Sequence, residues 1–295
     1  MQRDGLGSVA PHGAGPHSMG SAASQPATID MKNEIDGRVC DWMVSPVITL
    51  AEGMRLKEAA RQLELLGVSA LPVLDVNSRL TGVFSRVELL QAGRFVSENA
   101  EHARYLSLPE SCVADFMKTR VPVTRRHLSL AVCARRMHRQ SLHRLYIAED
   151  GPLEGVLTTR EMLSAVARAG IETPLSQLLQ RTIATISVRD PLASAMARLR
   201  ANSALTLVVT DNDTPVGVFT RADALISREA DPTEPIALWM DPNVLCLPAE
   251  LPAHRGAQQL HEARKRYVAA CEGRTVVGII SGLGFTELVA ANARA

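Results

Sequence analysis

One short pattern occurs four times along the chain and constrains the fold more than any other feature. It reads glycine, two apolar residues, a hydroxyl residue and, in three copies, an acid three positions later. The copies are LTGVFSRVELL, LEGVLTTREML, TPVGVFTRADAL and VVGIISGLGFTEL, which begin at residues 80, 153, 214 and 276 with small differences in phase. An apolar run that ends at a hydroxyl and an acid predicts a strand followed directly by a helix, and we call this point the junction.

A second pattern, a short helical turn that we call the opener, precedes each junction. The openers are Cys40–Met43, Ala114–Met117, Ser176–Leu179 and Ala237–Met240. The distances from opener to junction are 42, 41, 41 and 41 residues (Met43 to Ser85, Met117 to Thr158, Leu179 to Thr220, Met240 to Ser281). Similarity at a fixed spacing is typical of repeat architectures, so the sequence predicts four copies of one unit.

Between opener and junction the predicted elements come in a constant order. A β-rich piece comes first, at 47–49, 121–124, 183–186 and 244–247. An amphipathic helix follows, clearest at 56–66, and two strands come next, at 70–74 and 80–84 in the first unit. Each unit is therefore α+β, with the order βαββα. A unit of about 55–60 residues is too small to bury its sheet alone, so we expect the units to pair.

The element order, the ending G-h-h-[ST]-x-x-[DE] (h is apolar) and the tandem arrangement resemble the CBS-domain family over residues 38–292. The resemblance implies two Bateman modules, each a pair of CBS repeats packed through their sheets, and a pseudo-symmetric disc is one arrangement open to them. The expected boundaries are a disordered tail at 1–37 and repeats at 38–109, 110–170, 171–231 and 232–295. The long connection Gln91–Ser111 is expected to extend the preceding helix and then cross as a loop.

The junction of the third repeat, Thr220 and Asp223, is the first candidate for ligand binding. In ligand-binding members of the family this acid accepts hydrogen bonds from a ribose diol, so the resemblance implies an adenosyl site here. A capping box, in which hydroxyl and acid satisfy each other's backbone amides, is the alternative.

The other three junctions fit ligand binding less well. The capping box fits Ser85/Glu88 and Thr158/Glu161 better than a ribose site does, because both carry the longer acid. In the fourth repeat Gly284 stands where the acid is expected, so its ribose site is predicted to be lost.

The resemblance also implies that strand ends cradle the base of a bound nucleotide. The corresponding residues are Ile183, Ala184, Thr185, Ala204, Leu205 and Thr206 in the third repeat, and Val47, Ile48, Thr49, Ala70, Leu71 and Pro72 in the first. A purely structural role in the core or at a sheet edge is the alternative for each of them.

A basic run marks the second repeat. Eight Lys or Arg residues and no acid lie between Lys118 and Arg144, with three of the chain's eight histidines. A solvated basic face is the ordinary interpretation of such a run. Phosphate capture is the functional one, with His143 and Arg144 best placed just before a predicted strand. An acidic partner protein is a further alternative.

Composition and the absence of known motifs exclude several classes of function. The net charge of +1 and the 3% aromatic content argue against a nucleic-acid-binding surface. No apolar run is long enough to span a bilayer, and five cysteines without a CxxC pair favour a cytoplasmic protein with free thiols. No zinc-protease, P-loop, nucleophile-elbow or dinucleotide motif is present, and we expect neither catalysis nor a bound metal.

We therefore expect a non-enzymatic regulatory protein that binds AMP, ADP, ATP, S-adenosylmethionine or a related adenosyl ligand and signals to a protein partner. Homo-oligomer formation is compatible with this hypothesis. A ligand-free interaction scaffold is the main alternative, and a nucleic-acid-binding regulator that uses the basic run is a third.

Overall fold

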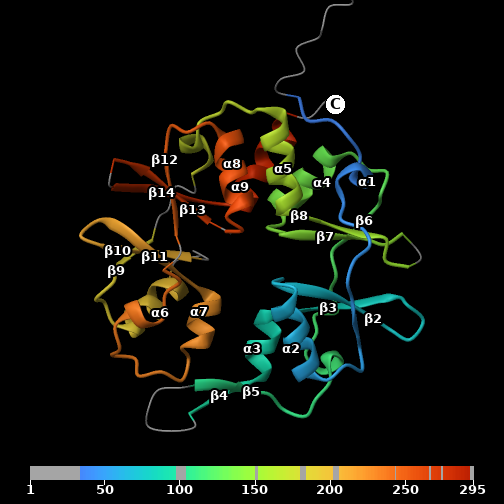
Figure 1. Ribbon diagram of the computed structural model, residues 1–295, viewed down its shortest axis with the longest axis horizontal. Helices are drawn as coiled ribbons and strands as arrows, with labels where there is room; N and C mark the ends of the chain where they lie inside the picture. Colours follow the sequence, from blue (N-terminus) through green and yellow to red (C-terminus); the bar gives the residue numbers. More distant parts are fainter. Residues whose placement is uncertain are drawn as a thin grey trace, which may run out of the picture. The chain divides into compact units, whose positions relative to one another are not determined.

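The computed structural model describes residues 34–97, 104–149, 152–179, 184–201, 206–242, 244–265, 267–273 and 275–292, all of which lie in one compact unit. Four small sheets of three strands each carry two helices, and one further sheet has two strands (Figure 1). None of the helices in these ranges is long and apolar enough to cross a bilayer.

The βαββα order occurs in all four repeats, as the sequence predicts. The first two repeats consist of α1 (Val39–Trp42), β1 (Leu50–Ala51), α2 (Leu56–Leu65), β2 (Ala70–Leu74), β3 (Leu80–Ser85) and α3 (Arg86–Ala92), and of the 3₁₀ turn η1 (Val113–Asp115), β6 (Val123–Thr124), α4 (Leu130–Arg139), β7 (Arg144–Ile147), β8 (Gly155–Thr158) and α5 (Thr159–Ala169).

The third and fourth repeats have the same elements in the same order. They consist of η2 (Leu175–Leu178), β9 (Thr185–Ser187), α6 (Leu192–Ala201), β10 (Thr206–Asp211), β11 (Thr214–Thr220) and α7 (Arg221–Ile226), and of η3 (Ile236–Leu238), β12 (Leu245–Pro248), α8 (Ala253–Glu262), β13 (Tyr267–Glu272), β14 (Thr275–Ser281) and α9 (Gly282–Ala291). In each of the four three-stranded sheets the first strand runs parallel to the second, and the second antiparallel to the third.

The openers are exchanged within each pair of repeats. The residue after each of three openers forms a bridge with the last strand of the neighbouring repeat: Val44 with Val156, Lys118 with Val83, and Asp241 with Val218. The repeats of a pair therefore complete each other's sheets, which explains physically why one repeat does not suffice.

The glycine of the repeated pattern follows from this exchange. The last opener residue packs directly on it: Met43 on Gly155, Met117 on Gly82, Met240 on Gly217 and Leu179 on Gly278. A β-carbon at any of these glycines would overlap the packed side chain. The glycines are thus required by close approach of the opener, since none of the four has a positive φ.

Helices join the two pairs. α4 and α5 of the second repeat pack against α8 and α9 of the fourth and share one apolar core, which includes Met137, Leu163, Leu260 and Phe285. α3 of the first repeat contacts α7 of the third. Within the second pair, Val208 and Val218 of the third repeat pack on Ile279 of the fourth through the sheet faces.

Three expectations need correction. The connection after the first repeat does not extend α3, which ends at Ala92; instead β4 (Arg94–Ser97) and β5 (Arg104–Ser107) form an antiparallel hairpin. The first strand begins at Leu50 rather than at residue 47. The predicted tail is too long at its C-terminal end, because Ile35 is buried in the core and its N–H donates to Asn292 O at 2.9 Å. Residues 1–33 lie outside the described ranges.

Candidate functional site

The junction of the third repeat forms a complete capping box. The carboxylate oxygen Oδ2 of Asp223 accepts hydrogen bonds from the backbone N–H of Thr220 at 2.7 Å and from its hydroxyl at 2.7 Å. The Thr220 hydroxyl in turn accepts from the N–H groups of Ala222 and Asp223, at 3.2 and 3.4 Å. The capping box, which the sequence favoured at the two junctions with glutamate, is therefore also formed by Thr220 and Asp223.

The environment of Asp223 sets it apart. Burial raises the pKa of its carboxyl; the hydrogen bonds from Thr220 lower that pKa, and the nearby charge of Asp241 raises it. Asp241 arrives from the opener of the fourth repeat, since its N–H and C=O both bond to Val218 on β11 at 2.9 Å. Two carboxylates thus face one half-buried junction.

Three threonines lie on one face of the third-repeat sheet. Thr206 is the cross-strand partner of Thr220, and Thr185 on β9 pairs with Val208, two residues further along β10. Side chains alternate along a strand, so all three share the face that carries Val208 and is turned toward the fourth repeat. The Thr206 hydroxyl is buried, with 7% of the residue exposed, and has no hydrogen-bond partner in the described chain. Ile183, Ala204 and Leu205 lie outside the described residues.

We refer to Thr206, Thr220, Asp223 and Asp241 as the third-repeat cluster. A buried hydroxyl without a partner costs free energy, because it has lost its hydrogen bonds to water without replacement. The cluster therefore offers a hydroxyl and carboxylate oxygens to a ligand that can donate and accept hydrogen bonds.

The junction of the first repeat is closed by its own protein groups. Glu88 accepts from the N–H of Ser85 at 3.0 Å and from its hydroxyl, while its other oxygen Oε1 lies 2.9 Å from Nζ of Lys118. Glu88 is only 2% exposed. Lys118 holds the same position after its opener as Asp241 does, so one repeat neutralises its junction acid and the other places a second acid beside it. Thr49 lies just before β1.

The second repeat uses its candidate residues internally. Glu161 accepts from the N–H of Thr158 at 2.7 Å and from its hydroxyl at 2.6 Å. Arg144 reaches into the first repeat and donates to Ala70 O at 3.3 Å and to Ser69 Oγ at 2.9 Å. The predicted ligand residues Ala70 and Arg144 are thus brought together, but they bond to each other.

Other cations of the basic run also contact protein acceptors. Arg125 pairs with Glu149 at 3.1 Å and Arg126 with Glu154 at 2.9 Å, while Arg136 donates to the backbone carbonyl of Val123. The C=O of His143 accepts from Thr159 N at 3.1 Å. These contacts favour a structural role for the run over phosphate capture.

The fourth junction is crowded at the position where the other repeats carry an acid. A β-carbon on Gly284 would lie 3.2 Å from Ile280 Cγ2 and 3.4 Å from the backbone oxygen of Leu178, which belongs to the exchanged opener. Ser281 caps no amide, and its hydroxyl is buried without a hydrogen-bond partner in the described chain.

Sequence reasoning missed Asp241, because the position after an opener carries no recognisable motif. The signal that could have found it is a comparison of repeats: Lys118 and Asp241 occupy equivalent positions with opposite charge.

Known proteins share this architecture. A crystal structure of an uncharacterized conserved protein from Pyrococcus horikoshii matches with a TM-score of 0.59 at 18% identity, covering 86% of this chain and 100% of that one. A protein of Methanocaldococcus jannaschii, described as a proposed archaeal homolog of γ-AMPK, matches with a TM-score of 0.67 at 13% identity, covering 85% and 99%.

A curated but uncharacterized protein of M. jannaschii is 24% identical over 159 residues, which are 48% of this chain and 38% of that protein. The chain thus matches well under half the length of this curated relative. The CBS domain family matches residues 39–94, 113–168 and 175–228, more than half of the chain. The fourth repeat lies outside these segments but has the same order of elements. On this evidence the chain belongs to the CBS-domain family, with four CBS repeats paired into two Bateman modules.

Proposed function

We propose that this protein is a non-enzymatic sensor that binds an adenine nucleotide or a related adenosyl ligand at the third-repeat cluster. Ligand binding would favour one relative arrangement of the repeats, which a protein partner reads. A ligand needs a differential affinity of only about 1.4 kcal/mol for one arrangement to shift the ratio tenfold.

One observation carries the proposal: the four junctions differ in what they leave for a ligand. Lys118 closes the first, the second is a self-contained capping box, and Gly284 removes the acid from the fourth. Only at the third do a half-buried acid and a buried hydroxyl without a described partner lie on adjoining elements. This is the pattern that a ribose diol would satisfy, since each diol hydroxyl can donate to a carboxylate and accept from a threonine.

The charge of the cluster indicates which adenosyl ligands fit best. Asp223 and Asp241 together disfavour a polyphosphate nearby and favour a neutral or cationic group. We therefore expect S-adenosylmethionine, whose sulfonium is positive, to bind more tightly than ATP. The proposed site of action is the cytoplasm, which agrees with the five free cysteines.

The proposal is tested by calorimetry and thermal shift with AMP, ADP, ATP, S-adenosylmethionine and cyclic dinucleotides on the full chain. Ligand at 100 times its dissociation constant should add about 2.7 kcal/mol of apparent stability. The variant Asp223→Asn keeps an acceptor for the cap but removes the charge, and should weaken binding at least tenfold. Glu161→Gln makes the same change at the second-repeat junction and is the matched control.

A ligand-free interaction scaffold is the second candidate. It is favoured by the first module, where Lys118 and Arg144 fill the space beside the junctions with bonded side chains. A panel in which no compound shifts the unfolding temperature of the wild type would replace the sensor by this scaffold. A shift lost in Glu161→Gln but kept in Asp223→Asn would move the site to the first module.

A further inference from the structure

Two cysteines of the fourth repeat lie on neighbouring strands and on one face of the sheet. In the parallel pair β12–β13, Cys246 is the partner of Ala269 and Pro248 is the partner of Cys271. Cys271 is two residues after Ala269, so its side chain points to the same face as that of Cys246. The two cysteines are therefore diagonal neighbours on adjoining strands.

The two thiols are open to reagents. Cys246 is exposed, and Cys271 is half-buried and donates to the backbone oxygen of Ala269 at 3.7 Å. Burial, followed by the neighbouring Cys246, raises the pKa of Cys271 to about 11, and burial also raises the pKa of Cys246. A metal ion that binds a thiol displaces its proton.

The pair lies on the sheet face that is turned toward the third repeat. Ala269 lies between the two thiols on this face and is the cross-strand partner of Ile279, which packs on Val208 and Val218 of the third repeat. Cys246 lies six residues after the last opener residue, Met240, and Thr185 lies six residues after Leu179, so the two hold equivalent positions in their repeats. The repeat that has lost its junction acid thus carries thiols on the sheet face that is turned toward the third repeat.

We propose that Cys246 and Cys271 together bind one soft, thiophilic metal ion, of which Cu(I) is the representative, through their two sulfurs. The ion replaces the two thiol protons: Cu⁺ and two R–SH groups give an anionic bis-thiolate complex, [Cu(SR)₂]⁻, and two H⁺, with no change of oxidation state. This site does not depend on the adenosyl site proposed above.

The ligand set selects the class of metal. Soft sulfur ligands select Cu(I), whereas structural zinc requires four ligands. Across the described ranges, no group of three or more His, Cys, Asp or Glu side chains is arranged to hold a metal ion. A two-coordinate ion suits two sulfurs on neighbouring strands, and it does not require the sulfur–sulfur bond geometry of a disulfide between diagonal neighbours.

The test titrates the reduced full chain with Cu(I) under anaerobic conditions against a competing Cu(I) chelator. We expect one ion per chain, held at least tenfold more weakly in Cys246→Ser and in Cys271→Ser but unchanged in Cys112→Ser, which removes a half-buried thiol of the second repeat. Release of two protons predicts an apparent association constant that rises about 100-fold per pH unit near neutrality.

Thiol alkylation followed by peptide mass spectrometry checks the site without any substitution. Cu(I) should protect Cys246 and Cys271 from alkylation and leave Cys40 and Cys112 reactive. The proposal is overturned if either serine variant binds Cu(I) as tightly as the wild type, or if protection falls on other cysteines. It is also overturned if the reduced pair forms a disulfide on adding Cu(I) rather than retaining the ion.

Discussion

Replacing Gly217 by alanine tests whether the exchanged opener holds the third junction in place. The new β-carbon would lie 2.7 Å from the backbone oxygen of Asp241 and 2.7 Å from Sδ of Met240. A flexible methionine can turn away, but the carbonyl cannot, because Asp241 is tied to Val218 by two backbone hydrogen bonds of 2.9 Å. The opener must therefore shift as a whole.

The expected cost follows from this geometry. Overpacking of this kind costs about 1–3 kcal/mol. Each weakened backbone hydrogen bond adds about 0.5–1.5 kcal/mol. With two such bonds, we expect Gly217→Ala to lower the free energy of unfolding by about 2–6 kcal/mol, which corresponds to a fall in Tm of roughly 4–24 °C.

The assay is urea unfolding and differential scanning calorimetry on Gly217→Ala, Gly53→Ala and Gly217→Ala/Met240→Ala. Gly53 is the matched control, because a β-carbon added there would have no heavy atom within 4 Å and its φ is not positive. Gly53→Ala should change stability by less than about 0.5 kcal/mol. The second substitution in the double variant should rescue only part of the loss, since the Asp241 carbonyl remains. Equal stabilities of Gly217→Ala and Gly53→Ala would refute the opener contact.

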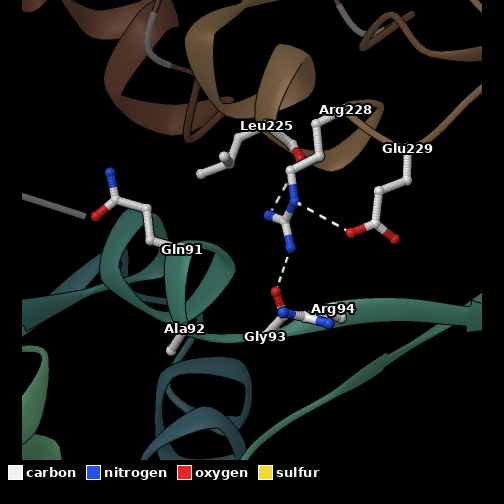
Figure 2. A pocket seen from close by; sticks show the side chains of 7 residues that line it. All are labelled: Gln91, Ala92, Gly93, Arg94, Leu225, Arg228 and Glu229. Atoms are coloured by element: carbon white, nitrogen blue, oxygen red, sulfur yellow. Dashed lines mark hydrogen bonds and ion pairs between the residues drawn. The ribbon is translucent and has the colours of Figure 1, made fainter.

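Three further perturbations test the remaining contacts. Lys118→Met should destabilise the first module by about 1–2 kcal/mol in urea unfolding. The loss is smaller than for a fully buried ion pair, because Lys118 is 67% exposed. Adding Glu88→Gln to this variant should restore most of the lost stability, because no buried charge is then left without a partner. Arg228 donates to backbone carbonyls at the end of α3 beside a polar groove between α3 and α7 (Figure 2), so Arg228→Ala should speed amide exchange there and Arg228→Lys should recover only part. Because the pKa of Asp223 is raised in the folded chain, the free energy of unfolding should fall as pH rises from 3.8 through that raised pKa. Asp241→Asn should make this fall shallower, because it removes a charge that raises the pKa of Asp223. If the variant has the same pH profile as the wild type, the carboxylates of Asp223 and Asp241 do not interact.

The repeat architecture could be predicted because its causes are local. The glycine, the hydroxyl and the spacing from Met117 to Thr158 or Leu179 to Thr220 reflect contacts that every repeat makes. The apolar stripe at Leu56 and Leu63 predicted α2, and both side chains are buried.

Long-range contacts could not be predicted in the same way. A constant spacing does not say which sheet an opener joins, so the exchange was invisible in the sequence. The sequence left Arg144 open to phosphate capture or to a solvated basic face, because nothing in a basic run indicates that its guanidinium bonds to Ser69. The β4–β5 hairpin was missed as well, although Phe95 and Val96 are residue types that favour strands.

The opposite charges of Lys118 and Asp241 lead to a prediction that links stability to ligand binding. Asp241→Lys would give the third junction the charge arrangement of the first, with an ammonium beside Asp223 in place of a carboxylate. The variant should be more stable than the wild type by about 0.5–1 kcal/mol, since repulsion is replaced by a partly exposed ion pair.

The same substitution should weaken S-adenosylmethionine binding at least tenfold, because Asp223 would then be held by the lysine and the positive group of the ligand would meet a positive side chain. Calorimetry and urea unfolding on one preparation measure both effects, and Lys118→Met shows whether loss of a charge at an equivalent position disturbs binding by itself. A variant that gains stability and keeps its affinity would show that Asp223 takes no part in holding the ligand. The opposed changes in stability and affinity therefore separate a junction kept open for a ligand from one that only caps a helix.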